Sequence, residues 1–346
     1  MKAQQLWFIN PRQLEIREQE LPSLAPGQIL VKSLCSAISA GTEMLVYRGQ
    51  LPSGIALDAS LESLQHQATY PLPYGYACVG RVEQIGTGVN ANWLDKRVFS
   101  FQPHASHFIA SPDQLIALPD GIEPEAAVFL ANMETAVSLV LDGNPALGER
   151  VAVLGQGIVG LLLSSLLAQF PLAQLHAVDG IAGRRDRALQ LGVRQAFDPA
   201  EHSQVAALKQ SLRLPVDLSA TPGSGADLIY EVSGMPEVLN LAIALCGYAG
   251  RIVVGSWYGN KSAHVQLGGV AHRNRIKLIS SQVSTIAPEL SGRWDKARRF
   301  ELAWDMIRRV QPQQLISHRL PLDQADSIYR LLDQAPEQVL QAIFIY

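Results

Sequence analysis

The sequence is poor in cysteine, in long apolar runs and in excess charge of either sign. Its 346 residues include three cysteines, Cys35, Cys78 and Cys246, which are scattered and form no Cys-x-x-Cys pair. This spacing excludes a disulfide framework and a structural zinc knuckle. The formal net charge of -3 provides no excess of positive charge that would attract nucleic acid or anionic lipid. We therefore expect a small-molecule substrate, no nucleic-acid partner and no membrane partner.

The N-terminus also lacks the features of a secretory signal. Met1 to Asn10 contains no basic segment followed by a long apolar core. The longest apolar stretch, around residues 158–167, is too short to span a bilayer. With the unpaired cysteines, these observations favour a reducing compartment and predict a cytoplasmic protein.

The length of the chain favours two domains rather than one. Up to about residue 120, short strand candidates are broken by proline and glycine, which predicts a β-rich, barrel-like domain. From about residue 123 helix and strand candidates alternate, which predicts an α/β domain with a doubly wound parallel sheet. The strand candidates are Gln28–Ser33, Gly80–Gly86, Arg97–Phe101, Val151–Leu154, Leu175–Val178, Asp227–Val232, Arg251–Gly255 and Gln341–Tyr346.

A glycine-rich turn follows one of these strands. It reads Gly155-Gln156-Gly157-Ile158-Val159-Gly160 and is succeeded by an apolar segment without proline that is long enough for a helix. In a dinucleotide-binding fingerprint the first glycine allows the tight turn, the second lets the backbone approach a pyrophosphate, and the third lets the helix pack on the strand. Strand, turn and helix in this order predict a dinucleotide site; the alternative is an ordinary glycine-rich turn.

The choice of dinucleotide depends on Asp179, which lies nineteen residues after the last glycine and ends the next strand candidate. A carboxylate here accepts hydrogen bonds from the ribose hydroxyls and repels a 2′-phosphate, so it favours NAD over NADP. Arg184 and Arg185 follow closely and could accommodate a phosphate, so NADP remains possible. Arginines at such positions otherwise open the next helix and face solvent.

The order of these parts resembles the medium-chain dehydrogenase/reductase superfamily, the relatives of zinc alcohol dehydrogenase. Three further segments support the resemblance: Asp95–Val98, Leu118–Gly121 and Ile316–Leu322. It implies a GroES-like catalytic domain formed by residues 1–123 and 284–346, and a Rossmann domain formed by residues 124–283. It also implies a homodimer joined through the nucleotide-binding sheets, with residues 275–281 at the edge. The nicotinamide pocket would be bordered by Glu231–Gly234, which includes Val232 and Ser233, and by Gly255–Trp257.

The sequence departs from the superfamily where the catalytic zinc would bind. Ala40 stands in place of the cysteine ligand, Tyr76 in place of the histidine ligand, and Thr135 near the third position. Alanine cannot coordinate a metal, and phenol or alcohol hydroxyls are poor replacements for thiolate and imidazole. The four-cysteine structural zinc loop is missing. We therefore expect no metal site and no zinc.

Without zinc, other groups must manage the substrate oxygen. By the resemblance Tyr76 faces the substrate and can donate to a developing oxyanion, and Thr42 matches the hydroxyl that binds the substrate oxygen. Glu43 matches the acid that orients the metal-bound histidine; it is either available for a new role or pairs with a nearby base. His104 is a candidate acid or base, whereas His107, three residues on, would point to the opposite face of a strand. For Tyr76 and both histidines the alternative is a structural role.

A narrower resemblance lies in Ser36–Pro52, which is similar to the corresponding segment of the zinc-lacking bacteriochlorophyllide (hydroxyethyl) dehydrogenases. Quinone reductases, which also lack zinc, match this segment less well. We expect a zinc-independent NAD(H)-dependent oxidoreductase acting on a secondary alcohol/ketone pair, with hydride transferred in the cleft between the domains. Two alternatives remain: an NAD(P)H-dependent reductase of enone or quinone-type double bonds, and a catalytically silent nucleotide-binding protein.

Overall fold

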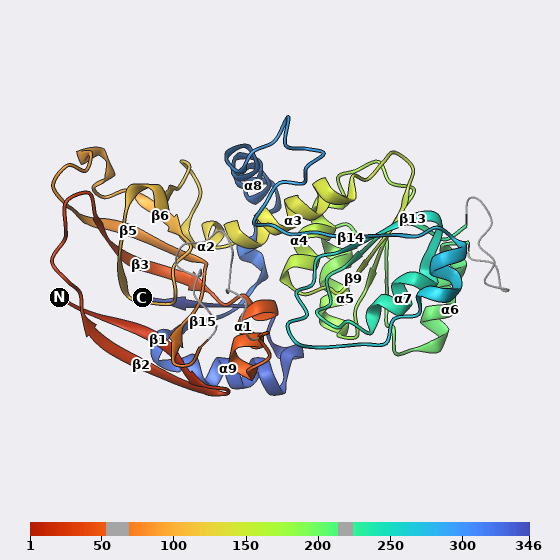
Figure 1. Cartoon of the computed structure of the whole chain (residues 1–346), viewed down its shortest axis with the longest axis horizontal. Helices are drawn as coiled ribbons and strands as arrows, with labels where there is room; N and C mark the ends of the chain where they lie inside the picture. Colours follow the sequence, from red (N-terminus) through yellow and green to blue (C-terminus); the bar gives the residue numbers. More distant parts are fainter. Residues whose placement is uncertain (53–68, 214–223) are drawn as a thin grey trace. The chain divides into compact units, whose positions relative to one another are not determined.

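The computed structural model describes residues 1–52, 69–213 and 224–346. The chain divides into two compact units, Met1–Ala131 with Trp304–Tyr346, and Asn132–Ala303; Figure 1 traces their elements. The divisions fall inside helix α3 (Leu130–Gly143) and helix α8 (Lys296–Val310). The predicted boundaries, after residues 123 and 283, lie earlier in the chain.

A buried ion pair explains why the second unit extends into α8. Arg299 of α8 donates from Nε and Nη2 to Glu134 of α3 at 3.0 and 2.6 Å. Its Nη1 also donates to Ser138 Oγ at 2.8 Å and to the carbonyl oxygen of Thr285 at 3.1 Å. The guanidinium is 1% exposed, so each donor needs an acceptor inside the protein. The start of α8 is thereby fixed to α3.

The first unit contains two sheets whose pairings are antiparallel except for one. The larger sheet has the order β15-β16-β3-β5-β6-β8, with β7 also paired to β3, and the smaller has the order β2-β1-β4. Strands β15 and β16 are parallel to each other, and β16 pairs with β3, so the C-terminal segment completes the N-terminal sheet. The strands are β1 (Lys2–Asn10), β2 (Gln13–Glu20), β3 (Ile29–Ala37), β4 (Leu72–Pro73), β5 (Cys78–Ile85), β6 (Arg97–Ser100), β7 (His107–Ala110), β8 (Ile116–Ala117), β15 (Ile316–Pro321) and β16 (Gln341–Ile345).

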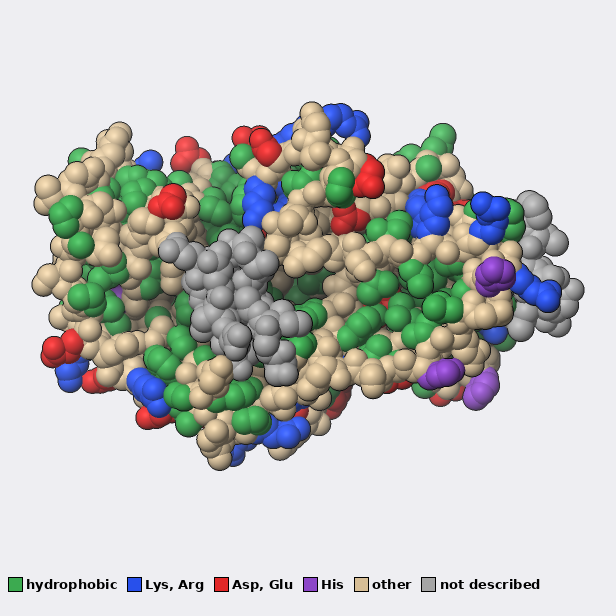
Figure 2. Space-filling model, in the orientation of Figure 1, with side chains coloured by type: hydrophobic (Ala, Val, Ile, Leu, Met, Phe, Trp, Pro, Cys, Tyr) green, Lys and Arg blue, Asp and Glu red, His purple; other side chains and the backbone are tan. Residues whose placement is uncertain are grey.

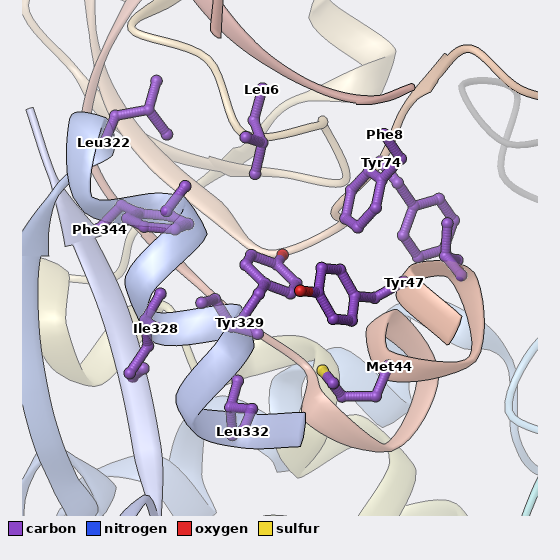
Figure 3. Close-up of a cluster of buried hydrophobic side chains, with 14 of the residues drawn as sticks. Leu6, Phe8, Met44, Tyr47, Tyr74, Leu322, Ile328, Tyr329, Leu332 and Phe344 are labelled. Carbon is purple, nitrogen blue, oxygen red and sulfur yellow. The ribbon is translucent and has the colours of Figure 1, made fainter. Parts of the chain in front are cut away.

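Helix packing closes one end of this unit. The helices are α1 (Ala40–Arg48), α2 (Pro124–Ala127) and α9 (Ala325–Gln334), with 3-10 turns at Ala91–Trp93, Pro112–Gln114, Pro312–Leu315, Leu322–Gln324 and Pro336–Gln338. Figure 3 shows Tyr329 of α9 among Tyr47 and Met44 of α1 and Phe8 of β1. The ring centroids of Tyr47 and Phe8 each lie 5.5 Å from that of Tyr329. This aromatic core holds α1 and α9 against the sheet.

The second unit is a Rossmann fold, and the predicted α/β class is confirmed. Its six strands are all parallel and have the order β11-β10-β9-β12-β13-β14, the order of a doubly wound dinucleotide-binding sheet. The strands are β9 (Arg150–Leu154), β10 (Gln174–Val178), β11 (Gln195–Phe197), β12 (Ala226–Glu231), β13 (Cys246–Val254) and β14 (Lys277–Ser280). The helices, besides α3, are α4 (Ile158–Leu167), α5 (Ala182–Gln190), α6 (His202–Ser211), α7 (Val238–Leu245) and a π-helical turn at Leu267–Ala271.

Burial agrees with the apolar runs in the sequence. The central strands β9 and β12 are buried on both faces, as parallel strands covered by helices are. Strand β14 is outermost in the sheet order; the homodimer expected along it stays a prediction. All three cysteines are free and buried.

No helix within residues 1–52, 69–213 and 224–346 combines the length and the apolar character needed to cross a membrane. On the face that Figure 2 shows, acidic and basic side chains are intermixed, and neither sign forms a large patch of its own.

His176 of β10 makes the stability of the second unit depend on pH. Its side chain is fully buried, with Nε2 3.1 Å from Ser211 Oγ, and its ring packs edge-on against Phe197. Burial, reinforced by the charge of Arg194, lowers the pKa of His176 from 6.5 to about 4.

Because the unfolded chain binds this proton below about pH 6.5 and the folded chain only below about pH 4, stability is present above pH 6.5 and declines as the pH falls. We predict that lowering the pH from 7 to 5 costs the wild type about 1 to 2 kcal/mol more unfolding free energy than it costs His176→Leu. Urea unfolding at both pH values measures the difference. Equal losses in the two proteins would show that His176 is not the group responsible.

Candidate functional site

The glycine turn is built by close approach of backbone to backbone. Gly155 follows β9 and has a φ angle of +98°. A residue with a side chain would be strained in this conformation. A Cβ atom there would lie 2.6 Å from the backbone nitrogen of Ser233, and a Cβ atom on Gly160 would lie 2.0 Å from the carbonyl oxygen of Gly155. These two glycines therefore let the turn pass the end of β12 and let α4 pack on the turn.

Gly157 differs from the other two because no protein atom lies within 4 Å of the position of a Cβ atom. It precedes Ile158 and Val159, which open α4, and no side chain caps the helix there. The backbone N–H groups at this end of α4 are therefore positioned to donate to an anion, and the open side of Gly157 allows a phosphate to approach. The close approaches at Gly155 and Gly160 agree with the turn and packing roles that the sequence predicts, and the phosphate role of Gly157 stays a prediction.

Asp179 lies at the end of the neighbouring strand β10 and orients the turn. Its Oδ2 accepts from the backbone N–H of Gln156 at 2.6 Å, and its Oδ1 accepts from that of Ile181 at 2.8 Å. Arg184 Nη1 lies 4.0 Å from the Asp179 carboxylate. Arg185 pairs instead with Asp198 at 2.8 Å and opens α5. Of the two arginines, Arg184 is the one beside the carboxylate.

A second buried carboxylate organises the end of β12. Glu231 is fully buried and accepts from the backbone N–H of Ser233 at 2.8 Å and from the Tyr258 hydroxyl at 2.5 Å. Burial, and then the hydrogen bond to Glu231, raise the pKa of Tyr258 well above its ordinary value. The loop after Glu231 is fixed further by Ser256, whose hydroxyl accepts from the N–H of Gly234 at 2.9 Å.

The structure brings the predicted cofactor residues to one edge of the parallel sheet. Each follows the carboxyl end of a strand, and β10, β9, β12 and β13 are adjacent in the sheet. This edge is where open α/β sheets bind ligands. The residues are Gly155, Gly157, Ile158, Val159 and Gly160 after β9, Asp179 and Arg184 after β10, Val232 and Ser233 after β12, and Gly255 and Trp257 after β13. The resemblance also names Glu231 in this set, and the structure adds Tyr258, for which the sequence carried no signal.

In the first unit, Tyr76 and Thr42, both expected near the substrate oxygen, lie in contact with each other. The Tyr76 hydroxyl donates to Thr42 Oγ1 at 3.2 Å, and both side chains are partly exposed. Thr42 lies in the first turn of α1, and Tyr76 follows Gly75 just before β5. The edge of the Tyr74 ring packs against Tyr76 with the centroids 6.1 Å apart. Two hydroxyls at this distance can hold one substrate oxygen between them.

Glu43 and His104 pair with each other in the interior. Both are fully buried, and His104 Nε2 lies 3.0 Å from Glu43 Oε2. Of the two roles predicted for Glu43, the structure shows pairing with a nearby base. His104 does not lie on a strand; it precedes β7, whose first residue is His107, so the predicted alternation of the two histidines along one strand is wrong. His107 lies partly exposed, 3.8 Å from Glu83, and burial lowers its pKa.

Comparison with known proteins finds dehydrogenases of similar sequence and fold. The family model "Zinc-binding dehydrogenase" matches residues 159–300, which excludes the positions of Ala40, Tyr76 and Thr135. D-guloside 3-dehydrogenase of Escherichia coli (strain K12) is 23% identical over 350 residues, covering 96% of this chain and 96% of that protein. (R,R)-butanediol dehydrogenase of Bacillus subtilis (strain 168) is 25% identical over 283 residues, covering 74% of this chain and 78% of that protein.

Among solved structures, a short chain alcohol dehydrogenase from E. coli CFT073, complexed with cofactor NADH, has a TM-score of 0.78 at 17% identity, covering 100% of this chain and 99% of that chain. These matches support the resemblance to the medium-chain dehydrogenase/reductase superfamily that the sequence predicts. The predicted enzyme class, a dehydrogenase or reductase of this superfamily, is confirmed. The narrower resemblance of Ser36–Pro52 to the bacteriochlorophyllide dehydrogenases stays a prediction.

The residues at the superfamily's zinc position do not fit the metal. Ala40 offers no donor atom, and the Tyr76 hydroxyl is bonded to Thr42. Glu134, next to Thr135, is neutralised by Arg299. In the part of the chain that the structure describes, no three His, Cys, Asp or Glu side chains gather as metal ligands would.

The open side of Gly157 leads to a prediction about nucleotide binding. Gly157→Ala adds a methyl group that meets no protein atom but obstructs the phosphate, so NADH affinity falls at least about tenfold while the melting temperature is unchanged. Gly160→Ala, whose methyl group meets the Gly155 carbonyl, lowers both. NADH fluorescence titration and calorimetry measure the two quantities. Wild-type affinity in Gly157→Ala would contradict the assignment.

Proposed function

We propose that the protein is an NAD(H)-dependent oxidoreductase that interconverts a secondary alcohol and its ketone without zinc. The observation that supports this proposal is the hydrogen bond between Tyr76 and Thr42, because the resemblance aligns these two residues with the part of the superfamily that binds zinc and the substrate oxygen. The relatives D-guloside 3-dehydrogenase and (R,R)-butanediol dehydrogenase support a secondary alcohol by their names.

The second unit would hold the cofactor. The backbone at Gly157 and the first turn of α4 would bind the pyrophosphate, and Asp179 would accept from the ribose hydroxyls, which favours NAD. Glu231 fixes the Val232–Gly234 loop that would border the nicotinamide. When bound, the nicotinamide ring accepts or releases the hydride.

The hydroxyl pair would handle the substrate oxygen. On reduction the Tyr76 hydroxyl would give its proton to the ketone oxygen as the carbon receives the hydride, and the phenolate left behind would regain a proton from solvent, to which Tyr76 is partly exposed. On oxidation the phenolate form would accept the proton of the alcohol, and in both directions Thr42 would orient the oxygen by a second hydrogen bond. Glu43 and His104, which the sequence also suggests as catalytic candidates, are fully buried, so we assign them a supporting role instead.

This proposal predicts the effect of Tyr76→Phe. Losing the hydroxyl should lower kcat about 10²- to 10³-fold while leaving NADH affinity unchanged, because the ring and its packing remain. The assay uses a panel of secondary alcohols, ketones and enones with NAD(H). Tyr70→Phe is the matched control: its hydroxyl donates to the Val46 carbonyl, away from Thr42.

Other outcomes of this assay discriminate the alternatives. Unchanged turnover in Tyr76→Phe would remove the catalytic assignment. Turnover of enones alone would favour a double-bond reductase, and binding of NADH without any turnover would favour a silent nucleotide-binding protein.

Metal content provides a separate prediction. The purified enzyme should contain zinc far below one equivalent per chain, and prolonged dialysis against a chelator should leave its turnover unchanged, because the donor set at Ala40 and Tyr76 cannot hold the metal. Elemental analysis before and after dialysis makes the measurement. One equivalent of zinc whose removal abolishes turnover would refute zinc independence.

Cofactor preference can be tested at Asp179. Asp179→Asn removes the charge that repels a 2′-phosphate and leaves Arg184 beside it, so the preference for NADH over NADPH should fall at least about tenfold. Asp186→Asn, on the exposed face of α5, removes the same charge elsewhere and should leave the preference unchanged. The ratio of kcat/KM for the two cofactors is the readout, and equal ratios in all three proteins would contradict the role of Asp179.

A further inference from the structure

His104 supports the backbone that carries Tyr76. Its N–H donates to the carbonyl oxygen of Tyr74 at 3.3 Å, and its ring lies directly behind Gly75. A Cβ atom on Gly75 would lie 2.9 Å from Cδ2 of His104, and Gly75 has φ +126°, so only glycine lets the imidazole come this close. The position of Tyr76 is therefore coupled to the position of this ring.

Glu43 joins the same ring to the helix that carries Thr42. It follows Thr42 in α1, and its Oε1 accepts from the backbone N–H of Ser39 at 2.7 Å, which fixes the carboxylate to the start of the helix. Its Oε2 lies 3.0 Å from His104 Nε2 and also accepts from the Tyr329 hydroxyl. A movement of the imidazole would therefore displace both Tyr76, through the backbone at Gly75, and Thr42, through Glu43.

The ring itself cannot rotate without breaking other contacts. His104 Nδ1 lies 2.7 Å from Ser36 Oγ, which is 2.8 Å from the Tyr346 hydroxyl. The ring also meets Phe344 edge-on with the centroids 5.0 Å apart. With Nε2 protonated toward Glu43, Nδ1 accepts from Ser36, so every polar atom of the ring is satisfied. Because His104 is fully buried, it does not itself touch a substrate.

We infer that the Glu43–His104 pair is a buried clamp that sets the separation of the Thr42 and Tyr76 hydroxyls, which makes both residues positioning residues for the reaction. This inference rests on the proposed function. It assigns His104 to the backbone of Tyr76 and Glu43 to the first turn of α1, with one hydrogen bond between them. Misplacing a reacting group by about 1 Å can cost about 10²-fold in rate, so a clamp of this kind acts on kcat.

A double-mutant cycle tests the clamp. His104→Leu should lower kcat about 10- to 100-fold in the wild-type background and leave the KM for NADH unchanged. In the Tyr76→Phe background the same substitution should lower kcat little further, because the hydroxyl that it positions is already absent. The assay uses the member of the alcohol and ketone panel that is turned over fastest.

The two ways to fail are distinguishable. If Tyr76→Phe alone keeps wild-type kcat, Tyr76 is not the proton donor, and both the proposed function and the clamp that depends on it are overturned. If Tyr76→Phe lowers kcat and His104→Leu lowers it by the same factor in both backgrounds, only the clamp is overturned, because the two residues then act independently.

Two controls separate positioning from stability. Val82→Ala, in the core cluster formed by β3, β5, β6 and β7, should lower the melting temperature with little change in kcat. His104→Gln keeps a donor toward Glu43 and should recover much of the activity lost in His104→Leu. If the leucine variant does not fold, His104→Gln replaces it in the double-mutant cycle. In a crystal structure of His104→Gln or His104→Leu, the Tyr76–Thr42 oxygen separation should match 3.2 Å in the first and exceed it in the second. An unchanged separation in His104→Leu would overturn the clamp.

Discussion

The first unit depends on how one buried carboxylate is compensated. Glu43 is fully buried, and an uncompensated charge in that position would cost several kcal/mol. Its donors come from three parts of the chain: the Ser39 backbone at the start of α1, His104 before β7, and Tyr329 on α9. Because each donor is needed, α1, the segment around residue 104 and the C-terminal helix must assemble together. Burial, and then the charge of Glu43, raise the pKa of Tyr329 well above its ordinary value, which keeps this phenol a donor.

The two units form their candidate binding residues into a site in opposite ways. In the second unit the nucleotide edge is shaped by missing side chains: Gly155 and Gly160 let backbone meet backbone, and Gly157 leaves space. In the first unit the hydroxyl pair is shaped by large side chains held in a satisfied polar network. A glycine turn is a local device that needs only a strand before it and a helix after it. A polar network joins residues far apart in sequence and is built only once the tertiary fold exists.

This difference explains what could be predicted from the sequence. The α/β class, the parallel sheet and the glycine turn with Asp179 followed from apolar runs and residue spacing, which are local signals. The residues expected beside the nicotinamide followed from the resemblance. The expectation that Tyr76 and Thr42 lie near the substrate oxygen also followed from the resemblance to a known superfamily. The side-chain partners of Glu43 could not be predicted from the sequence, because His104 lies 61 residues away and Tyr329 lies 286 residues away in the chain. His104 was expected on a strand, yet the strand begins at His107, since the residues before it turn to support Gly75.

A site that lacks a metal must stabilise a developing oxyanion by orientation. A divalent ion attracts an oxygen from a range of directions, whereas a hydroxyl contributes only when its hydrogen lies close to the line between the two oxygens. Under the proposed function, with Ala40 and Tyr76 at the positions of two zinc ligands, stabilisation of the oxyanion would depend on the orientation of hydroxyl groups rather than on the charge of an ion. The retained acid Glu43 is consistent with this change: instead of orienting a histidine at position 76, it holds a histidine that lies behind that position. Under the proposed function this imidazole supports the backbone of Tyr76, so the buried network would position a phenol instead of a metal ligand.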